Sequence, residues 1–60
     1  MKIYAKRETA QELLGMLRNH GEQATLLSTS LERDESIIVV ENIPDNIKQW
    51  MKELATRIEK

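Results

Sequence analysis

The run Ile37-Ile38-Val39-Val40 constrains the fold of this chain more than any other feature. Four consecutive β-branched residues favour a strand, because the branch at Cβ packs well on a pleated sheet and restricts the side chain in a helix. Successive side chains of a strand point to opposite faces. Residues 37–40 therefore place two large apolar groups on each face of a sheet, and both faces need cover.

Two other segments are also predicted to be strands. Residues 2–5 (Lys-Ile-Tyr-Ala) alternate between polar and apolar and include β-favouring residues. Residues 23–31 follow a period of two and contain β-branched threonines. The charged cluster of residues 32–35 lies between this segment and residues 37–40. We therefore expect a β-hairpin whose turn is that cluster.

Two amphipathic helices are predicted to complete the chain. Thr9 followed by Glu12 matches a capping box, and Gly21 supplies a left-handed stop. Between them an apolar stripe follows helical spacing at Ala10, Leu13, Leu14 and Leu17. The second helix begins at residues 43–45 (Ile-Pro-Asp), and we expect Trp50 to lie in the core. Its apolar stripe consists of Ile47, Trp50, Met51, Leu54, Ala55 and Ile58.

The resulting element order, β-α-β-β-α, predicts one α+β domain over residues 1–60. A right-handed crossover is expected to place the first two strands parallel in one sheet. The hairpin then adds an antiparallel third strand. The expected architecture is a two-layer sandwich with a three-stranded mixed sheet and both helices on one face.

Size and the apolar second face together predict self-association. A chain of 60 residues buries only about 60% of its unfolded surface. It has no cysteine for a disulfide, so oligomerisation is the usual remaining source of stability. We expect a homodimer, or one protein partner, at the uncovered sheet face or at a strand edge, unless the sheet closes more tightly or a terminus covers that face. The candidate interface residues are Tyr4, Leu27, Leu31, Ile38 and Val40. On this hypothesis Val40→Glu or Leu27→Glu yields a monomer or an unfolded chain.

Basic residues provide a less favoured alternative, a weak nucleic-acid-binding or transcription-regulatory domain. Its candidate residues are Lys2, Lys6 and Arg7 near the N-terminus, and Lys48, Lys52 and Lys60 on an i, i+4 ridge of the second helix. The formal net charge is only −1, and no aromatic residue is interleaved with the ridge for base stacking. Glu53 and Glu59 flank the ridge, and an ordinary solvated helix face is the favoured interpretation of it.

Composition argues against catalysis. With no cysteine and one histidine, a structural zinc site and a thiol nucleophile are excluded. His20 has no carboxylate or hydroxyl partner at a defined spacing, and Gly15 and Gly21 form no phosphate-binding loop. No apolar stretch reaches the roughly 18 residues of a membrane span, and no signal-peptide pattern follows Met1. We therefore expect a cytoplasmic, non-enzymatic regulatory or adaptor protein without a cofactor or membrane partner, acting through protein–protein contacts.

Overall fold

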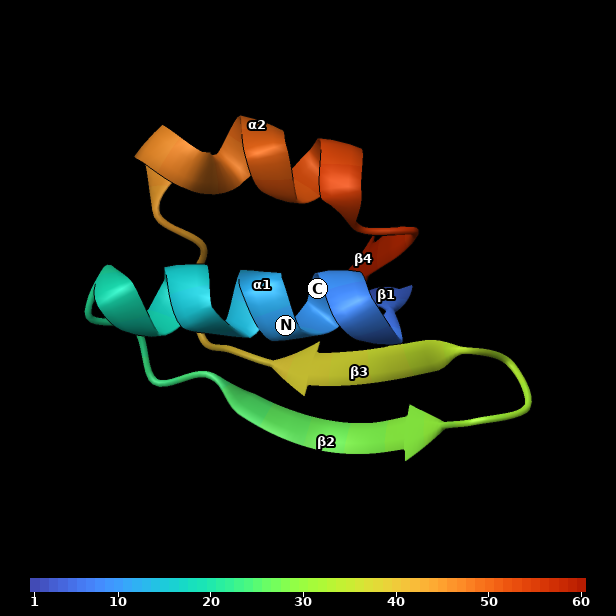
Figure 1. Cartoon of the computed structure of the whole chain (residues 1–60). Helices are drawn as coiled ribbons and strands as arrows, with labels where there is room; N and C mark the ends of the chain where they lie inside the picture. Colours follow the sequence, from blue (N-terminus) through green and yellow to red (C-terminus); the bar gives the residue numbers. More distant parts are fainter.

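Two helices and a four-stranded antiparallel sheet make up the fold of the computed structural model, which describes all 60 residues (Figure 1). The elements in chain order are β1 (Lys2–Lys6), α1 (Arg7–Asn19), β2 (Thr25–Ser30), β3 (Glu35–Val39), α2 (Asp45–Leu54) and β4 (Arg57–Glu59). The predicted α+β class is confirmed. The predicted three-stranded mixed sheet is wrong in strand number and in pairing.

The strand order β2-β3-β1-β4 explains the difference in pairing. β3 inserts between β1 and β2, so the first two strands run parallel without being neighbours, and each adjacent pair is antiparallel. Ile3 of β1 lies opposite Ile38 of β3 and opposite Ile58 of β4. The strongest β-forming segment thereby occupies an interior position of the sheet, where both of its edges are paired.

The fourth strand replaces the last turn of the predicted second helix. α2 ends at Leu54, and Ala55 has an extended backbone with ψ 144°. The Thr56 backbone N–H and hydroxyl both donate to the Tyr4 carbonyl oxygen, at 2.7 Å and 3.0 Å. These bonds dock the chain end beside β1. Thr56 and Ile58 are β-branched, and they fit an extended strand better than a helix terminus.

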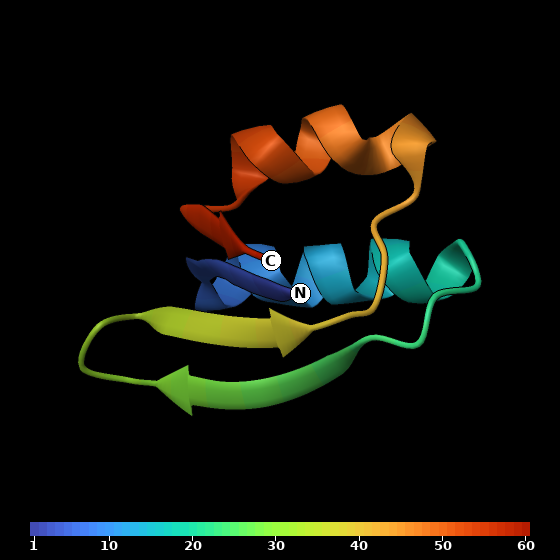
Figure 2. The ribbon, with the colours of Figure 1, turned by 180° about the vertical axis from the view of Figure 1, so that it is seen from behind.

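The helices lie side by side, with α1 against the sheet and α2 beside α1 near β4 (Figures 1 and 2). α1 begins at Arg7, directly after β1, without a side-chain cap. Its predicted apolar stripe is confirmed, since the buried residues of this helix are Ala10, Leu13, Leu14 and Leu17. α2 buries only Ile47 and Met51. The buried stripe of α2 is therefore narrower than the apolar stripe that its sequence predicts.

The core contains eleven buried apolar residues from both helices and the sheet. Ile38 and Val40 belong to it, with 0% and 1% of their surface exposed. Their proposed place on a free sheet face is therefore wrong, and Ile37 and Val39 occupy the other side of β3. Trp50 is 58% exposed, so its predicted place in the core is also wrong.

Candidate interaction surfaces

The sheet face away from α1 is less apolar than its sequence predicts. Its centre consists of Tyr4, Ile37 and Val39, all half-buried. β2 contributes only small polar residues to it, at Thr25, Ser28 and Ser30, which pair with outward-facing positions of β3. Two helices leave this face uncovered, as expected, but hydroxyl groups occupy much of it.

One candidate interface residue, Tyr4, is partly covered on this face by Arg57. The Arg57 guanidinium lies 4.1 Å from the centroid of the Tyr4 ring, and it also pairs with Glu59 at 2.9 Å. Hydrogen bonding to Tyr4 is the main cause that raises the pKa of Arg57 above its ordinary value. A guanidinium is always protonated in proteins, so Arg57 lies over the Tyr4 ring as a cation and shields it.

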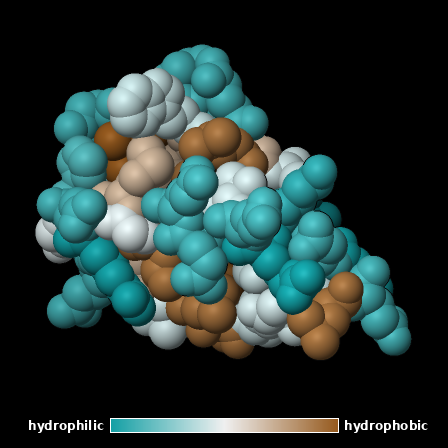
Figure 3. Space-filling view, in the orientation of Figure 1, coloured by the Kyte–Doolittle hydropathy of each residue, from teal (hydrophilic) through white to brown (hydrophobic).

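The free edge of β2 is the most apolar strand edge of the molecule. Leu26, Leu27 and Leu31 are 36%, 54% and 73% exposed. Figure 3 shows hydrophobic side chains along the lower rim, where β2 and the β2–β3 turn lie. A bulge between Leu26 and Ser28 makes Leu27 the extra residue. We call the outer side of Thr25–Ser30, together with Leu31, the β2 edge. The candidate residues Leu27 and Leu31 both belong to it.

A second exposed apolar pair lies on α2. Trp50 and Leu54 are one helical turn apart, and they are 58% and 41% exposed. Both lie on the flank of α2 opposite Lys48 and Lys52, because the buried residues Ile47 and Met51 fall between the two flanks in the helical rotation.

The opposite flank of α2 faces a pocket rimmed by lysines. Its cationic residues are Lys48 and Lys52, one turn apart on α2, and Lys60, which follows β4. The apolar lining consists of Met1, Ile43 and Ile58, and the cavity measures about 240 Å³. We call this cavity the lysine pocket. Three of the basic candidate residues therefore line the same cavity. They do not form one continuous helical ridge, because α2 ends at Leu54, before Lys60.

The other basic candidates lie elsewhere. Lys2 and Lys6 flank Tyr4 on β1, whereas Arg7 donates to the Asp34 carboxylate at 2.8 Å. Three of the six basic candidates thus line the lysine pocket, and the other three lie on β1 and at the start of α1. The nucleic-acid alternative, which uses the basic N-terminus together with the second helix, stays a prediction.

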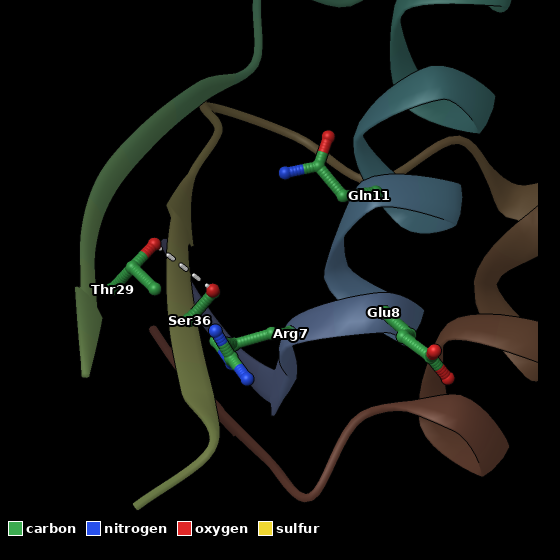
Figure 4. A pocket seen from close by; sticks show the side chains of 5 residues that line it. All are labelled: Arg7, Glu8, Gln11, Thr29 and Ser36. Carbon is green, nitrogen blue, oxygen red and sulfur yellow. Dashed lines mark hydrogen bonds between the residues drawn. The ribbon is translucent and has the colours of Figure 1, made fainter. Parts of the chain in front are cut away.

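A polar groove of about 390 Å³ lies between α1 and the β2–β3 hairpin (Figure 4). It is lined by Arg7, Glu8, Gln11, Thr29 and Ser36. The Ser36 and Thr29 hydroxyl groups bond to each other at 3.1 Å, and the Glu8 side chain points away from both. The groove therefore pairs no hydroxyl nucleophile with a base.

His20 is exposed at the end of α1, and its Nδ1–H donates to the Met16 carbonyl oxygen at 2.9 Å. This contact matches the structural role of a polar residue at a helix C-terminus. No group of three or more acidic, histidine or cysteine side chains is placed to hold a metal ion. None of the helices has both the length and the apolar character that a membrane crossing requires.

Comparison of the chain with protein-family models, curated proteins and solved structures finds no match.

Proposed function

We propose that this chain is a small protein-interaction module that acts by contact rather than by catalysis, and that it assembles as a homodimer through the β2 edge. The observation that supports this proposal is an edge strand with no charged residue and no proline that exposes Leu26 and Leu27. An unpaired edge leaves backbone N–H and C=O groups free to pair with another strand. Natural monomers usually protect such edges with lysine or proline.

The bulge in β2 favours pairing of the strand with a second copy of itself. Leu26 and Thr29 both face the core side, since they lie opposite Ile38 and Ser36. Thr25 and Ser30 both lie opposite outward-facing positions of β3. The in–out pattern is therefore symmetric about the middle of the strand. A bulge usually disrupts edge pairing. Here, antiparallel self-pairing about the strand centre matches Thr25 with Ser30, and Leu26 with Thr29, on the same faces.

Charges beyond the strand ends support the same register. Glu22 lies three residues before Thr25, and Arg33 lies three residues after Ser30. In an antiparallel pair centred on β2, Glu22 of one copy approaches Arg33 of the other, and the contact occurs twice. Neither side chain takes part in an ion pair within its own chain.

A charge-swap experiment tests both the dimer and its register. Glu22→Arg and Arg33→Glu each place like charges together at both ends of the proposed interface. We expect each variant alone to dimerise about tenfold more weakly than the wild type, measured by sedimentation equilibrium. Mixing the two variants restores opposite charges at both ends, so the mixture should form a heterodimer of near wild-type affinity.

The central variant is Leu27→Lys, which places a charge on the edge without removing a core side chain. We expect it to be a folded monomer by circular dichroism and sedimentation. Gln49→Lys adds the same charge on the exposed surface of α2 and should leave the dimer unchanged. A monomeric wild type, or equal behaviour of the mixed and separate charge-swap variants, would refute the assembly.

A further inference from the structure

We propose that the lysine pocket binds a small aliphatic carboxylate, with the alkyl chain inside the cavity and the carboxylate among Lys48, Lys52 and Lys60. The pocket lies between α2, the start of β1 and β4, and it contains no residue of the β2 edge. The proposal is therefore independent of the dimer.

The interior of the pocket suits an alkyl chain. Met1, Ile43 and Ile58 come from three separate segments and are half-buried, and Ile43 and Ile58 pack against the core. α2 buries only Ile47 and Met51, so the space beneath its lysine flank is not filled by its own side chains. An alkyl chain in this space removes apolar surface of both ligand and protein from water, which is favourable.

The rim of the pocket is cationic. Three lysine side chains line one small cavity, and no acidic side chain lines it. Both ion pairs of the chain lie elsewhere, and the Glu59 carboxylate beside Lys60 is engaged by Arg57 at 2.9 Å. Like charges held close together repel one another, so a bound carboxylate relieves this repulsion as well as pairing with the lysines.

Size and lining select the ligand class. A cavity of about 240 Å³ holds roughly eight non-hydrogen atoms, if each takes about the 30 Å³ of a liquid water molecule. This volume fits a medium-chain carboxylate. Neither aromatic residue of the chain, Tyr4 or Trp50, lines the pocket, so it offers no stacking surface for a nucleobase.

The test is a titration of the ¹⁵N-labelled chain with octanoate, octanamide and inorganic phosphate, followed by NMR. We expect saturable shifts at Ile43, Lys52 and Ile58 with octanoate, and a dissociation constant of about 1 mM or tighter. Octanamide has the same chain without the charge, and phosphate has charge without a chain. Both should bind at least fivefold more weakly. Equal binding of octanamide, or tighter binding of phosphate, would overturn the proposed ligand class.

Lysine variants test the site itself. Lys52→Gln removes one rim charge from an exposed helix position and should weaken octanoate binding about fivefold. Lys6→Gln removes the same charge from β1, away from the pocket, and should leave binding unchanged. Equal effects of the two variants would show nonspecific attraction to positive charge and would refute the site. So would the absence of saturable octanoate shifts.

Discussion

Ser36 shows how one polar side chain is accommodated in an aliphatic core. It is 1% exposed and is the one buried polar residue, and its hydroxyl bonds to that of Thr29 on the neighbouring strand at 3.1 Å. We expect Ser36→Ala to lower the free energy of unfolding by about 1 kcal/mol, because this bond is lost. Urea denaturation measures the change. Ser28→Ala removes an exposed hydroxyl from the other face of β2 and should change stability by less than about 0.5 kcal/mol. Equal losses would contradict the role of the bond.

The failure to predict the position of Trp50 also has a cause at the scale of residues. Helical spacing places Trp50 close to Ile47 and Met51, which are buried as expected. Periodicity reports which residues share a face, but it does not report how wide the partner surface is. α2 packs chiefly beside α1, so the contact covers a narrow stripe and leaves Trp50 and Leu54 exposed. The width of that contact depends on tertiary structure that a sequence pattern does not contain.

Among the elements, α1 offers a matched pair of glycine substitutions. Gly15 is exposed inside the helix, and an added Cβ would meet nothing within 4 Å. Gly15→Ala should therefore raise the free energy of unfolding by about 0.5–1 kcal/mol through reduced freedom of the unfolded chain. Gly21 follows α1 with φ +82°, so Gly21→Ala should lower it by about 1 kcal/mol. Thermal melts of both variants show whether each substitution raises or lowers the free energy of unfolding. A change in the same direction for both would contradict this assignment of backbone conformation.

Local sequence patterns predict the positions of most helices and strands, but they do not predict the order in which the strands pair. The stripe of α1 and the hairpin follow from spacing and β-branching, which act over a few residues, although β3 begins at Glu35 within the predicted turn and ends at Val39. β4 was missed because Ile58 fits the helical stripe as well as it fits a strand. The choice between them rests on the bonds of Thr56 to Tyr4, 52 residues away in sequence. The strand order and the bulge at Leu27 depend likewise on distant partners. Consequently, Leu27 and Leu31 were identified as exposed candidates, while Ile38 and Val40 were assigned to the wrong face.

At the scale of the whole molecule, the amount of exposed apolar surface is large for the size of the core. Twelve of 60 residues are buried, whereas five large apolar side chains are substantially exposed, three of them at the β2 edge. Val40 is in the core, so Val40→Glu reports only on folding. Leu27→Glu or Leu27→Lys, at an exposed position, separates assembly from folding.

Stability provides the broadest test of the proposed dimer. If folding and association are coupled, mass action makes the folded state more stable as the protein concentration rises. We expect the wild-type Tm to increase by several degrees between micromolar and near-millimolar chain concentrations, measured by circular dichroism in cells of different path length. Leu27→Lys should remove this dependence and leave the low-concentration Tm nearly unchanged, because Leu27 is 54% exposed in the monomer. A wild-type Tm that is independent of concentration would show that the 60-residue fold is stable without a second copy. The exposed leucines of β2 would then have to be explained without self-association.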